Sequence, residues 1–289
     1  MHPKDQVVLM NDEWKPRDQA FVDIEDRGYQ FGDGIYEVIR VYDGKMFMAS
    51  EHVHRLERSA REIGLTLPYP RARLIGHLEE LISRNGLKEG FIYVQITRGS
   101  APRMHHFPQK LTPPQLVAYT KDAQRPVELQ QNGVRAILTP DIRWLRCDIK
   151  TINLLGNVLA KEEAAKQNAY EAILHREHTV TEGSSTNVFI VQDGVLYTHP
   201  ATHLILNGIT RQKVIALCRK LKLDIREQPF TVAELLRADE VFITSTTNEI
   251  MPVIRINEKE IGPGIAGPFT IKLQEAFQED IDRVAYARH

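Results

Sequence analysis

Alternating apolar and polar positions predict β-strands at several places, most clearly over residues 35–42, where a period of two is sustained. Asp43 and Gly44 follow this run, and residues 45–47 come directly after them. Because an Asp-Gly pair adopts the positive φ angles of a tight turn at little cost, this stretch predicts a β-hairpin. The same arrangement returns over residues 187–198, so a second hairpin is expected there.

Apolar positions three and four residues apart predict helices in other stretches of the chain. These are residues 50–63, 70–85, 154–159, 210–221 and 271–281. Ser50 is expected to cap the first of them, because a serine hydroxyl accepts a hydrogen bond from the N–H groups at a helix start. Strands and helices occur along the whole chain, so the sequence predicts the α/β (α+β) class.

A polar stretch over residues 122–132 breaks this pattern and is the best candidate for a domain boundary. At 289 residues the chain is long enough for two domains of ordinary size. We therefore expect an N-terminal α/β domain over residues 1–121, a linker over 122–132, and a C-terminal domain over 133–289.

The overall composition argues against several classes of partner. The formal net charge is −1, and no run approaches the ~18 apolar residues needed to span a bilayer. We therefore expect neither nucleic acid nor a membrane as a partner. The N-terminus lacks the apolar stretch of a secretory signal, so a cytoplasmic location is expected. The two cysteines and eleven histidines lack the spacing of metal ligands, and no metal site is predicted.

Lys150 and Glu182 are the residues whose chemistry is most specific. Lys150 lies between apolar neighbours, Ile149 and Ile152, just before a predicted helix. Burial disfavours a charged amine, so such a lysine can lose its proton and attack a carbonyl. Glu182 precedes a predicted strand, and a carboxylate beside a pyridine nitrogen keeps that nitrogen protonated, which makes the ring an electron sink. Together they favour a pyridoxal-phosphate enzyme; the alternative for Lys150 is an ordinary solvated lysine.

Two stretches have the character of anion-binding sites. Ile209 and Thr210 lie at a predicted helix start, where free N–H groups attract an anion. The alternative is that Thr210 caps the helix. Ser245 and Thr246 belong to a run of four hydroxyl residues after a predicted strand, and suit either a phosphate or an exposed strand end.

Other basic and aromatic residues suit the recognition of anionic groups. Arg55 lies beside the apolar stripe of a predicted helix, where an arginine can grip a phosphate with two hydrogen bonds. Arg103 and His105 lie two residues apart in a proline-containing loop and suit a carboxylate; the alternative is a solvated basic loop. Tyr36 lies in the first predicted strand, where its alternative is packing across the strands.

Several motifs of the chain resemble those of the D-amino-acid aminotransferases. They are W-L-R-C-D-I-K-x-x-N-L-L-x-x-V-L-A-K around Lys150, E-A-I-L-H-R at residues 171–176, and T-V-T-E-G-S-S-x-N-V-F around Glu182. P-R-x-H-x-F at residues 102–107 resembles the pattern that separates this family from its relatives. Those relatives, within the fold-type IV pyridoxal-phosphate enzymes, include branched-chain aminotransferases and aminodeoxychorismate lyase. The resemblance extends from about residue 26 to about residue 254.

The resemblance implies a role for each candidate residue. Lys150 would hold pyridoxal 5′-phosphate as a Schiff base and then move a proton to and from the substrate Cα, while Glu182 would pair with the pyridine nitrogen. The further cofactor contacts that it implies are Arg55, Leu206, Ile209, Thr210, Ser245 and Thr246. The substrate contacts that it implies are Tyr36, Arg103 and His105. In the family, the loop arginine and histidine reach across a homodimer interface to the substrate carboxylate in the partner's site.

The resemblance also implies a fold and a reaction. The fold would have a smaller N-terminal α/β domain and a larger, strand-rich C-terminal domain, with the cofactor between them. The reaction would be ping-pong transamination of D-amino acids with a 2-oxo acid, in which D-alanine and 2-oxoglutarate give pyruvate and D-glutamate. The alternatives are aminodeoxychorismate lyase and an (R)-amine or branched-chain aminotransferase of the same fold. A cofactor-free binding protein is disfavoured, because the lysine, glutamate and phosphate positions are all present.

Overall fold

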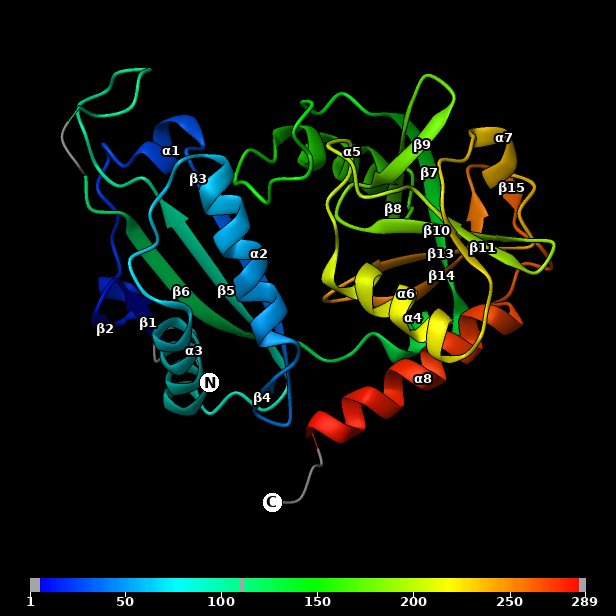
Figure 1. Ribbon diagram of the computed structural model, residues 1–289, viewed down its shortest axis with the longest axis horizontal. Helices are drawn as coiled ribbons and strands as arrows, with labels where there is room; N and C mark the ends of the chain where they lie inside the picture. Colours follow the sequence, from blue (N-terminus) through cyan, green and yellow to red (C-terminus); the bar gives the residue numbers. More distant parts are fainter. Residues whose placement is uncertain (1–5, 110–111, 286–289) are drawn as a thin grey trace. The chain divides into compact units, whose positions relative to one another are not determined.

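The computed structural model describes residues 6–109 and 112–285 (Figure 1). These residues divide into two compact units. Unit 1 comprises residues 6–124, apart from the gap, together with Ile149–Asn153 and residues 283–285. Unit 2 comprises Arg125–Asp148 and Leu154–Asp282.

Unit 1 is built on a six-stranded antiparallel sheet with the strand order β2-β1-β6-β5-β3-β4. The strands are β1 (Val7–Met10), β2 (Glu13–Pro16), β3 (Gly34–Tyr42), β4 (Lys45–Met46), β5 (Gly90–Thr97) and β6 (Gln115–Asp122). β3 pairs with β5 along its length, from Gly34 opposite Thr97 to Val41 opposite Gly90. Successive side chains of a strand point to opposite faces, so the period of two in the sequence gives this sheet one apolar face.

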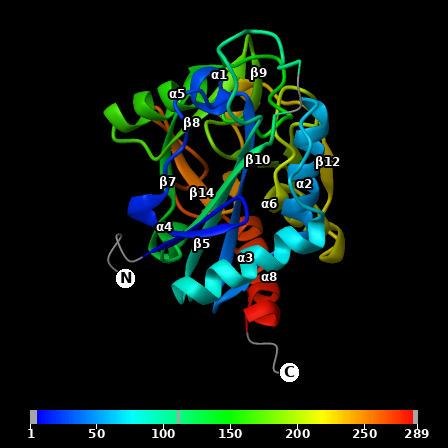
Figure 2. The same cartoon turned by 90° about the vertical axis from the view of Figure 1, so that its left-hand side faces the viewer.

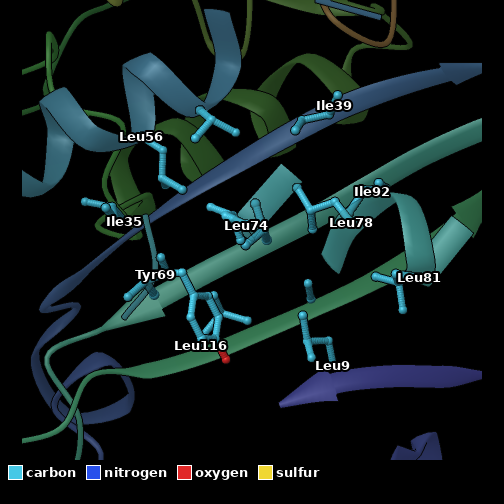
Figure 3. Close-up of a cluster of buried hydrophobic side chains, with 14 of the residues drawn as sticks. Leu9, Ile35, Ile39, Leu56, Tyr69, Leu74, Leu78, Leu81, Ile92 and Leu116 are labelled. Carbon is cyan, nitrogen blue, oxygen red and sulfur yellow. The ribbon is translucent and has the colours of Figure 1, made fainter. Parts of the chain in front are cut away.

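Two helices, α2 (Ala49–Glu62) and α3 (Arg71–Asn85), lie along this sheet (Figures 1 and 2). Their apolar faces pack against one face of the sheet in a single core (Figure 3). That core includes Ile35, Ile39, Leu56, Leu74, Leu78, Ile92 and Leu116. Burying each side chain of this size contributes roughly 1.5–3 kcal/mol, so the core fixes β3 firmly against α2. A short 3-10 helix, η2 (Arg17–Gln19), and a one-turn helix, α1 (Arg27–Phe31), precede β3.

Unit 2 is built on a nine-stranded mixed sheet with the order β12-β11-β10-β13-β14-β7-β8-β9, in which β15 also pairs with β14. The β14–β7, β7–β8 and β11–β12 pairs are parallel and the others antiparallel. The strands are β7 (Val134–Pro140), β8 (Glu171–Arg176), β9 (Thr179–Gly183), β10 (Asn187–Gln192), β11 (Val195–Thr198), β12 (Ile225–Glu227), β13 (Glu240–Ser245), β14 (Glu249–Ile256) and β15 (Lys259–Glu260).

The helices of unit 2 are α4 (Val127–Asn132), α5 (Leu155–Lys166), α6 (Ile209–Lys220), α7 (Val232–Leu235) and α8 (Pro268–Ala285), the last of which ends in unit 1. Glu240 of β13 caps the start of α8, since the N–H groups of Phe269 and Thr270 donate to its carboxylate at 2.9 and 2.8 Å. None of the helices within residues 6–109 and 112–285 has the length and apolar character needed to cross a membrane.

Both predicted hairpins are confirmed as β3–β4 and β10–β11. The predicted cap at Ser50 is wrong, because α2 already begins at Ala49 and its N-cap is Met48, which provides no side-chain cap. The apolar positions that predicted α5 do not pack in this unit: Leu155 is 72% exposed and Val158 58%. α5 instead packs on β7 and β8 through its alanines, with a core of Ile137, Ala160, Ala164, Ala172 and Leu174.

The two units differ from the predicted domain ranges in two places. The predicted linker over 122–132 contains α4, whose buried Gln130 donates hydrogen bonds to the carbonyl of Asn248 and the carboxylate of Glu249. The Ile149–Asn153 segment lies in unit 1, although the predicted boundary put it in the C-terminal domain. The physical reason is backbone pairing, because Thr151 forms an antiparallel bridge with Ile35 of β3.

Candidate active site

Lys150 lies in the Ile149–Asn153 segment, and its backbone is bonded to two elements of unit 1. The N–H of Tyr36 in β3 donates to the Lys150 carbonyl at 3.1 Å. The N–H of Lys150 donates to Oγ of Ser59 at 3.2 Å, and Ser59 is a buried residue of α2. Lys150 is therefore held in place by the same strand and helix that form the core of unit 1.

The side chain of Lys150 lies over the aromatic ring of Tyr36, with Nζ 4.2 Å from the ring centroid. Tyr36 stacks on Tyr93 of β5, and Tyr93 stacks on Tyr119 of β6, with centroid separations of 5.6 and 5.2 Å. The stacked rings restrict the motion of Tyr36, and its ring face attracts the cation of Lys150. The structure thus brings together two of the predicted site residues, one by its backbone and the other by its ring.

Arg55 in α2 pairs with a buried carboxylate of β3, Glu37, which the sequence did not suggest as a site residue. Nε and Nη2 of Arg55 donate to the two oxygens of Glu37 at 2.7 and 2.9 Å. Nδ1 of His52 lies 2.8 Å from the same carboxylate. Burial alone would raise the pKa of Glu37, but the charges and hydrogen bonds of Arg55 and His52 outweigh burial and lower it far below its usual value. The predicted phosphate contact is thus oriented by a charged carboxylate.

Arg103 and His105 are exposed residues of the 101–107 loop, and both contact Phe31 at the end of α1. Cζ of Arg103 lies 5.0 Å from the centroid of the Phe31 ring. The His105 ring meets the Phe31 ring edge-on at 5.7 Å. The two predicted carboxylate contacts therefore share one aromatic neighbour.

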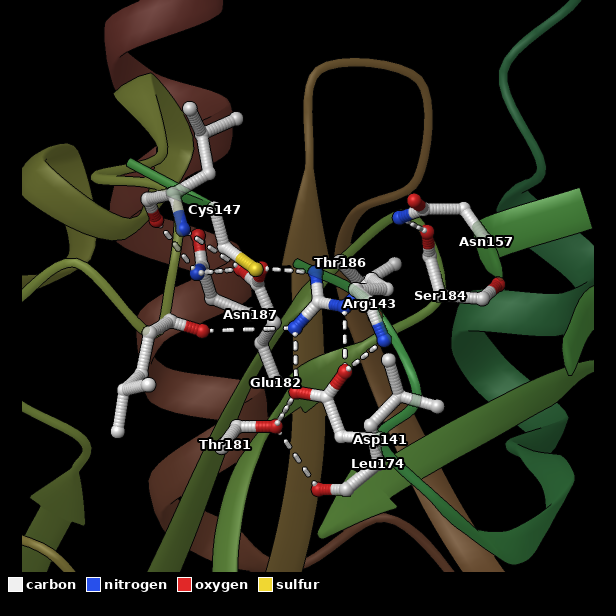
Figure 4. Close-up of polar contacts among 12 residues, drawn as sticks. Asp141, Arg143, Cys147, Asn157, Leu174, Thr181, Glu182, Ser184, Thr186 and Asn187 are labelled. Atoms are coloured by element: carbon white, nitrogen blue, oxygen red, sulfur yellow. Dashed lines mark hydrogen bonds and ion pairs between the residues drawn. The ribbon is translucent and has the colours of Figure 1, made fainter. Parts of the chain in front are cut away.

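In unit 2, Glu182 lies in β9 with 4% of its surface exposed, and three groups donate hydrogen bonds to its carboxylate (Figure 4). Nη1 of Arg143 donates to Oε1 at 2.5 Å. Nδ2 of Asn187 and the backbone N–H of Leu206 each donate to Oε2 at 3.0 Å. The structure thus brings together the predicted Glu182 and Leu206, and adds Arg143 and Asn187, which the sequence analysis missed.

Arg143 is shared between Glu182 and a second buried carboxylate, Asp141 (Figure 4). Burial raises the pKa of Glu182 to about 7; Arg143 lowers it without cancelling the rise, and the negative charge of Asp141 adds to it. For Asp141, burial is outweighed by the hydrogen bonds and charge of Arg143, helped by Arg176, and the pKa falls to about 2. A further positive group beside such a buried carboxylate would stabilise its charged form and lower its pKa.

The start of α6 lies beside this group. Its N-cap is Gly208, not Thr210, and none of the side chains that the structure describes caps the helix. A Cβ atom at Gly208 would lie 2.1 Å from Oδ1 of Asn187, so a larger residue would displace the side chain that donates to Glu182. The N–H groups of Ile209 and Thr210 lie in the first turn of a 12-residue helix, where they attract an anion.

Ser245 and Thr246 lie where β13 ends, next to the start of β10. Thr244 is paired with Asn187 across these two strands, so their side chains lie on the same face of the sheet. Oγ1 of Thr244 is buried and has no hydrogen-bond partner among residues 6–109 and 112–285. An orphaned buried hydroxyl is costly, which favours a polar ligand on this face. Ser245 itself accepts a hydrogen bond from the N–H of Asn248 at 3.1 Å.

The chain is similar to known proteins over most of its length. The model of the family described as amino-transferase class IV matches residues 34–256. A D-alanine aminotransferase from Bacillus licheniformis is 53% identical over 274 residues, which cover 95% of this chain and 96% of that protein. The solved structure of the T.th. branched-chain amino acid aminotransferase complexed with N-(5′-phosphopyridoxyl)-L-glutamate is 29% identical, with a TM-score of 0.89 over 99% of this chain and 96% of that one. A putative 4-amino-4-deoxychorismate lyase from Legionella pneumophila is 28% identical, with a TM-score of 0.82 over 91% of this chain and 97% of that one.

Proposed function

This chain belongs to the class IV aminotransferases, and we propose that it transfers the amino group of D-alanine to 2-oxoglutarate, giving pyruvate and D-glutamate. The observation that carries the proposal is the 53% identity to a D-alanine aminotransferase over nearly the whole of both chains. The arrangement of Lys150 over Tyr36, and of Arg103 and His105 around Phe31, supports it.

We propose pyridoxal 5′-phosphate as the cofactor, because the described residues fit each part of it. Glu182, with its raised pKa, suits the protonated ring nitrogen, and the uncapped start of α6 suits the phosphate. The orphaned hydroxyl of Thr244, next to Ser245, indicates a polar group on that face. Bound cofactor would supply an electron sink for the electrons released at the substrate Cα.

The chain's own residues then have distinct tasks. Lys150 would hold the cofactor through its amine until the amine of the substrate displaces it. The freed Lys150 amine would then take the proton from the substrate Cα and return a proton during the second half of the reaction. Glu182 keeps the ring nitrogen protonated, and Arg143 and Asn187 hold Glu182 in position. The further cofactor contacts proposed are Arg55, Leu206, Ile209, Thr210, Ser245 and Thr246.

Arg103, His105 and Tyr36 are proposed as the contacts for the substrate carboxylate. An arginine offers a planar pair of donors that matches a carboxylate, and a histidine and a tyrosine hydroxyl add further donors. D-alanine, 2-oxoglutarate and both products carry this carboxylate next to the reacting carbon. One set of contacts therefore serves every substrate of the ping-pong cycle.

We further propose that the enzyme is a homodimer in which Arg103 and His105 serve the partner's site. Unit 2 exposes a group of large apolar side chains around the start of α5, as expected of a surface that is covered in the assembly. The group consists of Ile142, Trp144, Leu145, Leu155, Val158 and Leu159. Gly156 lies against Arg143, which places the 142–145 segment beside the first turn of α5. The cytoplasmic location stays a prediction from the sequence.

The first test of the reaction is stereochemical. The protein, loaded with pyridoxal 5′-phosphate, is incubated with 2-oxoglutarate and either D-alanine or L-alanine, and pyruvate is followed. We expect pyruvate from D-alanine alone. Preference for L-alanine would contradict the roles of Arg103 and His105, and pyruvate from neither isomer would contradict the proposed reaction and make aminodeoxychorismate the next substrate to test.

A second test concerns Lys150. Treating the loaded protein with borohydride should leave the reduced cofactor covalently attached at Lys150, detectable in the mass of the peptide that contains it. Lys150→Ala should remain folded, lose this attachment and lose transamination. Turnover at the wild-type rate in Lys150→Ala would contradict the assignment.

A further inference from the structure

The 101–107 loop carries Arg103 and His105 but contains no helix or strand, so the positions of both side chains depend on neighbouring elements. We propose that Arg27 and Phe31, both in α1, are positioning residues that hold this loop for recognition of the substrate carboxylate. The inference rests on the proposed function, from which it takes the carboxylate contacts of Arg103 and His105.

Arg27 holds the backbone of the loop. It is a buried residue, with 2% of its surface exposed. Its Nη1 donates to the carbonyl of Met104 at 2.7 Å, and its Nη2 donates a longer bond to the carbonyl of His105 at 3.5 Å. Met104 therefore has a role that its sequence position did not reveal, because its carbonyl joins the loop to a buried guanidinium directly beside Arg103.

Asp33 fixes Arg27 in turn. Nε of Arg27 and Nε of Arg98 each donate to Oδ2 of Asp33 at 2.8 Å, and Nη2 of Arg98 donates to Oδ1 at 3.0 Å. Burial raises the pKa of Asp33, but the hydrogen bonds from Arg98 and Arg27 outweigh it, so the pKa is lowered. The carboxylate stays charged at neutral pH, and hydrogen bonds to a charged group hold the guanidinium of Arg27 in one orientation.

Phe31 holds the side chains of the loop. The guanidinium of Arg103 lies over the face of the Phe31 ring, and the rings of His105 and Phe31 meet edge to face. Cζ of Arg27 also lies 4.8 Å from the centroid of this ring. The aromatic face attracts the guanidinium of Arg103, and this attraction needs a ring rather than an apolar side chain of similar size.

Both ends of α1 are fixed within unit 1. At its start, Asp26 accepts hydrogen bonds from the N–H of Gly28 at 2.8 Å and from Oγ1 of Thr97 at 2.7 Å. At its end, Gly32 adopts a φ angle of 66°, and its carbonyl accepts a hydrogen bond from Nδ2 of Asn153 at 2.8 Å. Asn153 belongs to the segment of Lys150, so the support of the loop and the segment of the reactive amine are directly bonded.

Such support changes substrate binding without changing the chemical step. Ordering a flexible side chain on binding costs free energy, and a loop that is already held avoids part of that cost. The carboxylate interaction is made with substrate and transition state alike, so its loss raises KM more than it lowers kcat. Substrates without a carboxylate gain nothing from the support.

The experiment compares D-alanine with D-alaninamide, in which a neutral amide replaces the carboxylate. Phe31→Leu keeps an apolar side chain and removes the aromatic face. In this variant we expect kcat/KM for D-alanine to fall about fivefold, mainly through KM, and kcat/KM for D-alaninamide to change by less than about twofold. The ratio of kcat/KM for D-alanine to kcat/KM for D-alaninamide therefore measures how well the loop is positioned for the carboxylate.

Phe31→Tyr is the matched control, because it keeps the aromatic face and should keep the wild-type ratio. Arg27→Lys keeps a charge for Asp33, but one ammonium group cannot also hold the loop carbonyls, so this variant should lower the ratio as well. The double variant Arg103→Ala/Phe31→Leu should lower the ratio no further than Arg103→Ala alone, since Phe31 acts through Arg103.

Equal losses for both substrates, or no loss, in Phe31→Leu and Arg27→Lys would overturn the positioning role. Arg103→Ala separates this result from a failure of the proposed function. If Arg103→Ala lowers the ratio while the two α1 variants leave it unchanged, only the positioning role is wrong. If Arg103→Ala itself leaves the ratio unchanged, the carboxylate role of Arg103 is wrong, and the positioning role is wrong with it.

Discussion

Glu37 in unit 1 and Glu182 in unit 2 are both buried carboxylates bonded to an arginine, and yet their pKa values move in opposite directions. Burial raises the pKa of each, so burial does not explain the difference. Glu37 receives two hydrogen bonds from Arg55 and has His52 within hydrogen-bond distance. Glu182 receives one hydrogen bond from Arg143.

The second carboxylate on Arg143 adds to the contrast. Asp141 accepts hydrogen bonds from Nε and Nη2 of Arg143, and its negative charge raises the pKa of Glu182 further. At Glu37, two hydrogen bonds from Arg55 and the nearby ring of His52 stabilise the anion. Glu182 shares Arg143 with Asp141, so its charge is only partly compensated. It can therefore pair with a further cation, as a carboxylate that binds a protonated ring nitrogen must.

Among substitutions that distinguish Glu182 from Glu37, the largest expected effect is on catalysis. Glu182→Gln keeps the shape of the side chain but cannot carry the charge that holds a proton on a ring nitrogen. We expect kcat for D-alanine to fall on the order of 10³-fold, the middle of the range for losing proton control at a reacting group. Steady-state kinetics of the loaded variant would measure it, and a loss below about tenfold would contradict the role of Glu182.

The next effect concerns stability. Glu37→Gln removes a carboxylate charge that is bonded to the buried guanidinium of Arg55, and should lower the free energy of unfolding by roughly 3 kcal/mol. Glu57→Gln, also in α2, is the matched control: its partner Arg71 is exposed, so its loss of stability should be much smaller. Urea unfolding of the apoproteins would measure both, and equal losses would remove the contrast between a buried and an exposed pair.

The pH dependence of stability gives a third test. The folded pKa of Glu182 is about 7, against 4.5 for the free side chain. A raised folded pKa contributes stability that is complete below pH 4.5 and is lost as the pH rises through 7. Relative to Glu182→Gln, wild-type apoprotein should therefore lose roughly 2 kcal/mol between about pH 5.5 and pH 8. Parallel stability profiles for the two proteins would contradict the raised pKa.

The smallest expected effect is a change in the pKa of Glu182 when Asp141, which shares Arg143 with it, is substituted. Asp141→Asn removes the negative charge that raises the pKa of Glu182 and leaves Arg143 with one anionic partner in this group. The pH at which the Glu182-dependent stability loss is complete follows the folded pKa of Glu182, and should then move to lower pH by up to about one unit. Comparing the stability of Asp141→Asn with that of Asp141→Asn/Glu182→Gln isolates this pH, and an unchanged value would show that sharing of Arg143 does not set the pKa of Glu182.

The sequence predicted local structure well where the signal was local. The Asp-Gly turns at residues 43–44 and 193–194 carry their conformational preference in two adjacent residues, and both hairpins formed. The predictions that failed depended on tertiary packing, which local sequence does not encode. Ser50 has the right side chain for a cap, but Met48 takes that position. The leucines of α5 mark a helix correctly and still face outward, because its alanines fit against β7 and β8.

The candidate site shows the same limit. Lys150 and Glu182 were proposed from the sequence because their residue types and motifs carry chemistry. Arg143, Asn187 and Glu37 were missed, because each acts through a partner whose contact no spacing rule encodes. Arg143 meets Glu182 across 39 positions of the chain, and Glu37 meets Arg55 across 18. An arginine or a glutamate in an apolar stretch was the only signal, and many surface residues share it.

The Ile149–Asn153 segment also sets an order of events during synthesis. Residues 6–109 and 112–124 of unit 1 leave the ribosome first, then a stretch of unit 2 follows, and only afterwards does the segment that pairs with β3 emerge. A nascent chain that ends before residue 149 lacks the backbone partner of Tyr36 and the amine that lies on its ring. Unit 1 is therefore translated first but cannot complete its fold until the Ile149–Asn153 segment has been synthesised. Lys150 is among the last of its residues to be made.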